Sequence, residues 1–460
     1  MKPNKEASIA ARLAGWTSAL KLSQVPEDAA HIARRCIIDT LGVVIAGSHM
    51  PVARKIADHV EQEYRDGVCT MLGRDRGVTA TGAALANGTA AHILDFDDTS
   101  YAGIAHGSAI ILPALFAAAE HSNSDGASLL EAFIAASEVT YATGLGLTDS
   151  HYMTGWWATG TLGAIGAAAG AGNILGQSEA ALTAGIAFAA IQSNGMGAVL
   201  GYNAKPVLAG QAARRGLESA LLAGQEHTAP VNIFEHPRGF LQLMNDGQFE
   251  GSALSALGKD WRLVEPGIAI KISPVCSAAQ ASIVVVRQLI ADNKLDPSDI
   301  AHVRCEVPHL VKISLIHDRP EVASQAQFSM PFAVGCILAF GKLGPEQISD
   351  ATLENRELQD VMAKVEMVEA DDLNGPDFQP HFPESARVTL TMEGGDEFSG
   401  FLGAATGMPS NPMSDDDLSE KFKNCVSFAG WSDDRAGAVL ARLWDIENAG
   451  PIRAILREES

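Results

Sequence analysis

The sequence is poor in charged residues, and a long central stretch has no cation at all. Charged residues make up 19% of the 460 residues, and neither Lys nor Arg occurs between Arg76 and Lys205. The whole chain nevertheless has a net charge of −22. Nucleic acids and anionic membrane surfaces repel such a protein, so we expect neither as a partner. An anionic substrate would need a local cluster of cations.

Cysteine is also scarce. The six cysteines stand far apart, at positions 36, 69, 276, 305, 336 and 425, and no C-x-x-C pair occurs. This spacing disfavours a structural zinc site and a fold stabilised by disulfides. The first residues, M-K-P-N-K-E-A-S, lack the hydrophobic core of a signal sequence. We therefore expect a reduced protein in the cytoplasm.

Hydrophobic runs of the kind that cross membranes are absent as well. The nearest approach is residues 159–176, T-G-T-L-G-A-I-G-A-A-A-G-A-G-N-I-L-G, which are rich in Gly and Ala but poor in Leu, Ile and Phe. A membrane span needs about 20 predominantly apolar residues. Because small residues let helices approach closely, this segment predicts a helix buried in a protein core.

The sequence does have apolar residues at helical spacing throughout its first part. We expect helices at residues 9–20, 29–46, 52–64, 79–94, 109–121, 127–144, 179–192 and 205–223. Ser178 precedes one of these helices and is a suitable N-cap. The pattern predicts a large all-helical domain over residues 1–267.

The character of the sequence changes near Pro266. Residues 300–308 and 386–392 alternate apolar and polar side chains, which is typical of strands, and residues 397–402 return after Gly394-Gly395 as a hairpin. Further helices are expected at residues 277–290, 322–341, 415–423 and 433–447. The predicted fold is mainly α, with the helical domain, a smaller α+β domain over residues 268–404, and C-terminal helices within residues 405–460 that return to the first domain.

Acidic side chains are concentrated in one short, otherwise apolar segment. Asp95, Asp97 and Asp98 are followed by His106 in H-I-L-D-F-D-D-T-S-Y-A-G-I-A-H-G-S. Carboxylates this close raise one another's pKa values, which suits a general acid or base. Two other interpretations are a solvated helix end and a metal site with oxygen and nitrogen ligands, although no Gly-rich phosphate loop accompanies it.

Two isolated lysines are natural partners for these acids. Lys205 is the first cation after the long gap, and Lys271 stands in the apolar run I-A-I-K-I-S-P-V-C-S. Either could instead be a surface residue whose stem lies along an apolar face. Lysines that face a carboxylate and an imidazole suit removal of a proton from a carbon next to a carboxylate. This chemistry indicates loss of water, decarboxylation with return of a proton, or epimerisation.

Four motifs, in order along the chain, resemble the MmgE/PrpD family: A-N-G-T-A-A-H-I-L-D-F-D-D-T, H-G-S-A-I-I-L-P-A, T-G-T-L-G-A-I-G-A-A-A and A-K-P-V-L-A-G-Q-A-A-R-R-G. This family includes 2-methylcitrate dehydratase, cis-aconitate decarboxylase and iminodisuccinate epimerase. The resemblance implies an all-helical domain with a smaller α+β lid, a homodimer, and an active site between the two domains.

The resemblance also assigns site residues by position. Asp95 and Thr99 fall in the acidic motif, His106 on the histidine after it, Lys205 on the K-P lysine, and Lys271 on the lysine before a P-x-C/H segment that here contains Cys276. Polar groups that are usual in the family are replaced here by Trp157, Leu208, Gln280 and Phe332. Tyr152, close to Trp157, is a reserve acid or base.

We therefore expect a lyase, either a dehydratase or a decarboxylase, that acts on a small di- or tricarboxylic acid without a cofactor or metal ion. Asp95 or His106 would move the proton, while Lys205 and Lys271 would hold carboxylate or enolate oxygens. Thr99, Trp157, Cys276, Gln280 and Phe332 would contact the substrate. The replaced polar groups predict a substrate that is smaller or less charged than 2-methylcitrate. The alternatives are an epimerase that uses the same base and a binding protein that has lost catalysis.

Overall fold

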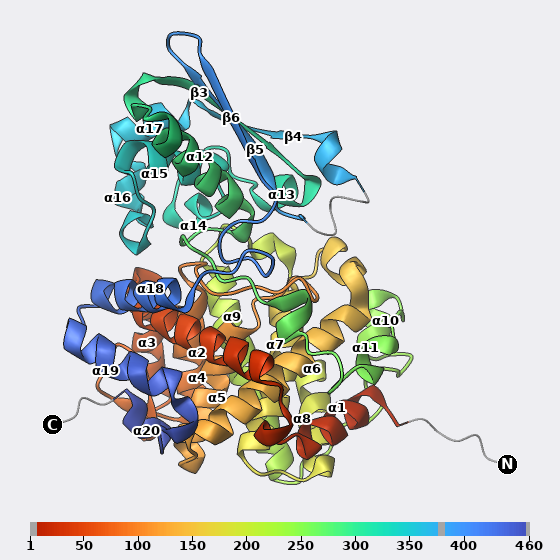
Figure 1. Cartoon of the computed structure of the whole chain (residues 1–460). Helices are drawn as coiled ribbons and strands as arrows, with labels where there is room; N and C mark the ends of the chain where they lie inside the picture. The colour runs from red at the N-terminus through yellow and green to blue at the C-terminus, as the bar shows by residue number, and fades with distance from the viewer. Residues whose placement is uncertain (1–6, 376–381, 457–460) are drawn as a thin grey trace.

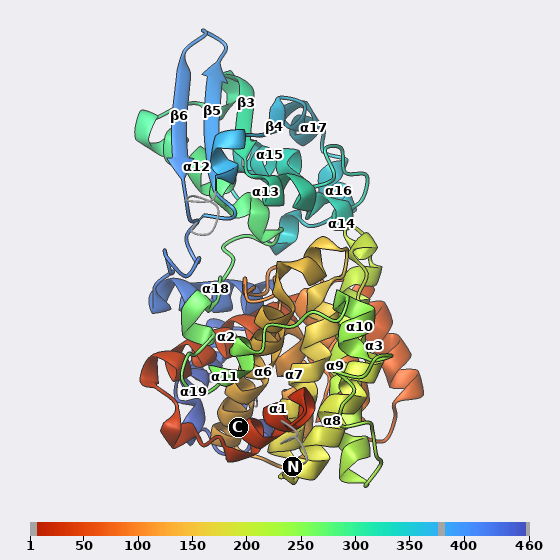
Figure 2. The same cartoon turned by 90° about the vertical axis from the view of Figure 1, so that its right-hand side faces the viewer.

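The computed structural model describes residues 7–375 and 382–456. Figures 1 and 2 show a large helical body and a smaller part with a β-sheet that lies over one end of it. We call residues 273–402, as far as they are described, the α+β part. The fold is mainly α with a smaller α+β part, and the predicted fold class is therefore confirmed.

The helical body contains most of the helices expected from the sequence. Its long helices are α1 (Ile9–Ala19), α2 (Glu27–Gly47), α3 (Pro51–Glu63), α4 (Ala80–His92), α5 (Ser108–Ser122), α6 (Gly126–Met153), α7 (Ala158–Ile174), α8 (Glu179–Gln192) and α9 (Ala204–Gly224). Two short helices, α10 (Phe240–Asn245) and α11 (Ser252–Ser255), and a small ribbon of β1 (Cys69–Thr70) and β2 (Gly77–Val78) complete it. Helix α8 has the predicted bounds, and the Ser178 side chain accepts a hydrogen bond from the Ala181 N–H, as expected of its N-cap.

Helix α6 is longer than the pattern predicts. It continues past residue 144 to Met153, with one break at Thr148, whose φ is 58°. Only one side of this extension is buried, because Leu147 and His151 are buried whereas Leu145 and Met153 are exposed. This extension carries Tyr152 toward the α+β part.

Helix α7, formed by the Gly- and Ala-rich segment, is buried in the body. A Cβ atom at Gly166 would lie 1.8 Å from the Thr140 Oγ1 of α6, so only Gly lets the two helices pack this closely. Within the described residues no single helix is long and apolar enough to cross a membrane. The pair α2 and α3, bent by 86°, reaches that length and composition only when the two are taken together.

The close approach of α4 and α9 determines where the acidic segment lies. A Cβ atom at Gly88 of α4 would lie 2.9 Å from the Gly210 Cα of α9, and one at Gly210 would lie 2.3 Å from the Leu85 carbonyl oxygen. These distances are too short for non-bonded atoms, so both positions require Gly. The end of α4 that precedes Asp95 therefore lies beside the start of α9, which carries Lys205.

The α+β part has a four-stranded sheet in the order β4-β3-β5-β6. Its strands are β3 (Ile300–Val307), β4 (Val365–Glu369), β5 (Ala386–Met392) and β6 (Glu397–Leu402). Strand β3 pairs with β4 in parallel and with β5 antiparallel, and β5 pairs with β6 in the predicted hairpin. The sequence analysis did not predict β4, which is short and follows a helix without a turn signal.

The helices of the α+β part are α12 (Gln280–Asn293), α13 (His309–Ser314), α14 (Ala323–Ala326), α15 (Met330–Phe340), α16 (Asp350–Leu353) and α17 (Arg356–Met362). The prediction of one helix over residues 322–341 is wrong, because α14 and α15 are separate. The Ser329 side chain caps α15 by accepting from the Phe332 N–H at 3.2 Å, and the Gln327 amide donates to the Ile93 carbonyl at 2.9 Å. The break therefore contacts the helical body.

The C-terminal helices lie against the helical body, as the blue ribbon in Figure 1 shows. They are α18 (Asp415–Phe428), α19 (Asp433–Trp444) and α20 (Ile452–Ile455), and α18 packs on α2. The two segments that connect the body with the α+β part lie side by side, because the Ile270 N–H donates to the Gly407 carbonyl at 2.8 Å. Ala269 pairs with Thr99 through two further backbone hydrogen bonds.

Lys421 of α18 anchors the acidic segment to the body. Its ammonium nitrogen lies 2.6 Å from the Asp39 carboxylate of α2 and donates to the Phe96 carbonyl at 2.9 Å. The same nitrogen lies 3.9 Å from the centre of the Phe96 ring. Lys421 and Asp39 are both buried, so each needs the other charge to offset the cost of burial.

Replacement of Lys421 by Met is expected to destabilise the protein by roughly 3–5 kcal/mol, because the Asp39 carboxylate is left buried without its cation. Denaturation in urea, followed by circular dichroism, measures the loss. The double variant Asp39→Asn/Lys421→Met removes both charges, and we expect it to be more stable than the single variant. Equal stabilities of the two variants would contradict this account.

Candidate active site

The carboxylate of Asp95 lies between the ammonium groups of two lysines. One oxygen accepts a hydrogen bond from Lys205, and the other accepts one from Lys271 at 3.0 Å. Lys271 also donates to the Asp95 backbone carbonyl at 2.7 Å. The backbone of Asp95 is left-handed, with φ 48°, a conformation that Asp adopts more readily than most residues. The structure thus brings the two isolated cations together on one buried acid.

Electrostatics determine the protonation of this cluster. Burial raises the pKa of Asp95, but the charges of Lys205 and Lys271 outweigh burial and hold that pKa far below its ordinary value. Burial lowers the pKa of Lys271, whereas the charge of Asp95 raises it, and the net change is upward. Asp95 is therefore an anion that accepts protons poorly, and Lys271 is a cation.

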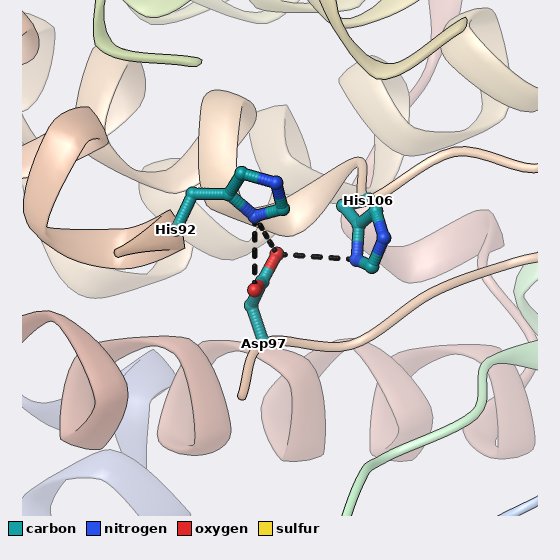
Figure 3. A group of neighbouring side chains, drawn as sticks. All are labelled: His92, Asp97 and His106. Carbon is teal, nitrogen blue, oxygen red and sulfur yellow. Dashed lines mark hydrogen bonds and ion pairs between the residues drawn. The ribbon is translucent and has the colours of Figure 1, made fainter. Parts of the chain in front are cut away.

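Asp97 joins two histidines in a similar way (Figure 3). His92 Nδ1 lies 2.8 Å and 3.0 Å from the two carboxylate oxygens of Asp97, and His106 Nδ1 lies 3.3 Å from one of them. Burial raises the pKa of Asp97, but the two histidines outweigh it and lower that pKa well below its ordinary value. Burial also lowers the pKa of His92 to about 4, against the opposing charge of Asp97. His92 is therefore neutral near pH 7.

His106 is the more accessible of the two rings. Its side chain is 16% exposed, whereas that of His92 is fully buried. His106 Nδ1 also lies 2.8 Å from the Asp98 carbonyl oxygen. Both of these neighbours of His106 Nδ1 are hydrogen-bond acceptors, so in the neutral ring the proton sits on Nδ1. Nε2 is then the nitrogen that can exchange a proton with a substrate. Figure 3 shows Nε2 on the side of the ring that faces away from Asp97.

A small cavity lies next to these groups, with walls from both the helical body and the α+β part. Its volume is about 50 Å³, room for only a few water molecules at ~10–15 Å³ each. Of the predicted residues, seven line it: Asp95, Thr99, His106, Tyr152, Trp157, Lys205 and Cys276. A substrate must therefore displace side chains or move the α+β part when it enters.

Three predicted residues lie outside this lining. Lys271 is behind Asp95 and contacts it rather than the cavity. Gln280 is buried and bonds its amide to the backbone of Ser273 and Val275, so it holds the loop after Lys271 in shape. Phe332 is fully buried in α15. Direct contact of Gln280 and Phe332 with a substrate stays a prediction, because neither side chain lines the cavity.

Two aromatic rings, those of Phe328 and Trp157, form a wall around the Lys205 ammonium group. The Lys205 nitrogen lies 4.9 Å from the centre of the Phe328 ring and 5.9 Å from that of Trp157. Trp157 also packs against His92, with ring centres 5.4 Å apart. Leu208 is partly buried one turn further along α9 and does not line the cavity. The indole therefore narrows the space in front of the lysine, as its size predicts.

Some residues at the site were not found by sequence analysis. Tyr101, Ser277, Phe328 and Glu384 line the cavity together with Ile104, Leu200, Leu310 and Ser314. His92 and Asp97 also belong to the site, and both lie in the acidic segment. A histidine close to several acids in sequence was the signal that could have identified His92. Glu384 gave no signal, because its partners come from distant parts of the sequence.

His92, Asp97 and His106 also offer a possible metal site, since one ligand atom of each lies within 4.8 Å of the others. Both imidazoles already use Nδ1 on Asp97, which satisfies that carboxylate without an ion. Two ammonium groups stand at the neighbouring Asp95, and their charges oppose a divalent cation. The arrangement therefore fits acid–base chemistry better than metal binding.

Comparisons with known proteins agree with this architecture. The chain matches the MmgE/PrpD N-terminal domain over residues 11–252 and the MmgE/PrpD C-terminal domain over residues 273–446. The protein therefore belongs to the MmgE/PrpD family, as its motifs predict.

Several relatives carry a functional name. The cis-aconitate decarboxylase-like protein oryM of Aspergillus oryzae is 25% identical, over 92% of this chain and 91% of its own length. Cis-aconitate decarboxylase of Homo sapiens is 25% identical, over 98% of this chain and 95% of its own. The enzyme of that name from Aspergillus terreus is 23% identical, over 91% and 89%. Family and relatives together confirm the prediction of an enzyme of the lyase type.

Asp98, the third acid of the segment, is unlike the other two. It is buried and accepts a hydrogen bond from the Ser108 hydroxyl at 2.5 Å. Burial raises the pKa of Asp98 to about 7, because the Ser108 bond only partly offsets it and the charges of Asp39 and Asp97 add to it. The folded protein therefore holds this proton more tightly than the unfolded chain does.

This shift predicts how stability depends on pH. An acid whose pKa is raised in the folded state favours folding below its unfolded pKa, near 4, and this contribution is lost as pH rises through about 7. The Asp98→Asn side chain cannot ionise. The melting temperature of this variant, relative to that of the wild type, should therefore rise as pH increases from 5 to 8. Calorimetric scans across this range test the prediction, and a constant difference between the two curves would refute it.

Proposed function

We propose that this protein is a decarboxylase or dehydratase of a small di- or tricarboxylic acid, acting without a cofactor. The observation that carries the proposal is that Lys205 and His106 line one small cavity, so a cation and an imidazole face the same volume. The relatives named cis-aconitate decarboxylase support decarboxylation as the first reaction to test.

Lys205 would bind a substrate carboxylate and stabilise charge that develops on it. An ammonium group has three N–H donors, and Asp95 accepts from only one of them. Lys271 holds Asp95 from the other side, so the anion keeps Lys205 in a fixed position. When CO₂ leaves, the electron pair of the broken C–C bond remains on the substrate and spreads onto the carboxylate near Lys205.

His106 would then give a proton to the carbon that has lost CO₂. Nδ1 is held by the Asp98 carbonyl and the Asp97 carboxylate, so Nε2 is the atom that transfers the proton. Asp97 also stabilises the positive charge that the ring carries before the transfer. Asp95 is less suited to this role, because its pKa is held far below neutral.

Tyr152 would serve as a donor rather than a base. Burial raises the pKa of Tyr152 to about 12, so the phenol keeps its proton near pH 7. In a dehydration, this hydroxyl could protonate the departing hydroxide while His106 removes the proton from carbon. The same residues therefore support either lyase reaction, and product analysis distinguishes them.

His106→Ala and Lys205→Ala should each lower kcat/KM by roughly 10²- to 10⁴-fold, because each removes a group that acts in the transition state. Release of CO₂ or water from a panel of di- and tricarboxylic acids, including cis-aconitate, measures the loss. His121→Ala, on an exposed ring far along α5, is the control and should keep full activity.

Two outcomes would change the assignment. Full activity in both His106→Ala and Lys205→Ala would show that the chemistry lies elsewhere. Exchange of deuterium from solvent at the carbon next to the carboxylate, without release of CO₂ or water, would identify an epimerase instead.

We further propose that the protein is a homodimer in the cytoplasm. The family resemblance supports the dimer, and the free thiols of all six cysteines fit a reducing compartment. Light scattering at micromolar concentration tests the dimer directly.

A further inference from the structure

Glu384 is a buried carboxylate in the wall of the cavity. It lies in the α+β part, just before β5, and is 7% exposed. One oxygen accepts from the Tyr101 hydroxyl of the helical body at 2.7 Å, and the other accepts from the Ser277 hydroxyl at 2.8 Å. Both partners also line the cavity.

The partners of Glu384 are neutral, unlike those of Asp95. In the part of the chain that the structure describes, no Lys, Arg or His nitrogen lies within 4.0 Å of the Glu384 carboxylate. Asp95 has an ammonium group on each oxygen. Burial raises the pKa of Glu384, and the hydroxyl donors of Tyr101 and Ser277 and the charge of Lys271 only partly offset this rise. Glu384 therefore brings to the cavity a carboxylate that has no ion-pair partner among the described residues.

The positive charge available to a substrate is correspondingly small. Lys205 reaches the cavity, but it shares its charge with Asp95, and Lys271 stands behind that acid. Trp157, which also lines the cavity, carries no charge. A substrate in the cavity therefore meets both the Lys205 ammonium group and the Glu384 carboxyl group.

We propose that Glu384 determines substrate specificity, because it excludes a third carboxylate from its end of the cavity and so selects dicarboxylates over tricarboxylates. This inference rests on the proposed function, since it assumes that an acid binds at Lys205. A ligand carboxylate next to Glu384 would put two anions together in a buried site, which is strongly unfavourable. A methyl group or a neutral hydrogen-bond donor at the same place would not be repelled.

Glu384 also links the α+β part to the body through Tyr101, and the test must separate this link from the charge. Tyr101→Phe breaks the hydrogen bond and leaves the carboxylate in place. Glu384→Gln removes the charge, keeps the shape, and retains an amide oxygen that can accept from a hydroxyl. The two variants therefore differ in charge while both alter the link.

The experiment compares two acids of one skeleton, cis-aconitate and citraconate, in which a methyl group replaces the third carboxylate arm. Isothermal calorimetry at pH 8 gives both dissociation constants for the wild type, Glu384→Gln and Tyr101→Phe. We expect the wild type to bind citraconate more tightly, and Glu384→Gln to gain roughly tenfold or more in affinity for cis-aconitate with little change for citraconate. Tyr101→Phe should show no such selective gain.

An unchanged affinity ratio in Glu384→Gln, or the same change in both variants, would overturn the role of charge at Glu384. Either result would leave the acid site at Lys205 intact, because the wild type would still bind an acid. Failure of both acids to bind the wild type, or equal binding to Lys205→Ala, would overturn the proposed function together with this inference.

Discussion

The ionised carboxylate of Asp95 holds together three parts of the chain that are distant in sequence. Asp95 follows α4 in the chain. Its carboxylate accepts hydrogen bonds from Lys205 at the start of α9 and from Lys271 in the segment that leads to the α+β part. Without this anion, two ammonium groups would be buried side by side without a counter-charge, which is prohibitively unfavourable. The position of the substrate-facing lysine and the path of the connecting segment thus depend on the same carboxylate.

The three acids of one short segment have three different electrostatic environments. Asp95 is paired with lysines and Asp97 with histidines, and both have lowered pKa values. Asp98 has the Ser108 hydroxyl and the Cys36 thiol as side-chain donors, and burial raises its pKa to about 7. Repulsion among the carboxylates of the segment, which is the argument available from sequence, contributes only to the raised pKa of Asp98, where burial and the charge of Asp39 contribute more. The partners of each acid, which come from other helices, decide the rest.

Local patterns in the sequence were sufficient for the elements with regular periodicity. Helix α8 and strands β5 and β6 have the predicted bounds, because apolar spacing and capping residues mark their ends. The long gap in cations also predicted Lys205 as a site residue, because a lone cation in an apolar stretch needs an acidic partner. The break before α15 and the place of Glu384 could not be predicted, since each depends on a contact with a distant segment: Gln327 with Ile93, and Glu384 with Tyr101.

The close contact between Gly88 of α4 and Gly210 of α9 limits which residues of this site can be substituted. Any side chain there would push α9 away from α4 and withdraw Lys205 from Asp95, so the charged frame tolerates no change at that crossing. Ser277, Phe328 and Glu384 stand on the opposite wall, outside the crossing. Side chains that line the cavity from the α+β part can therefore be exchanged during evolution without disturbing the frame that holds Lys205, so this wall is free to adapt to a new substrate.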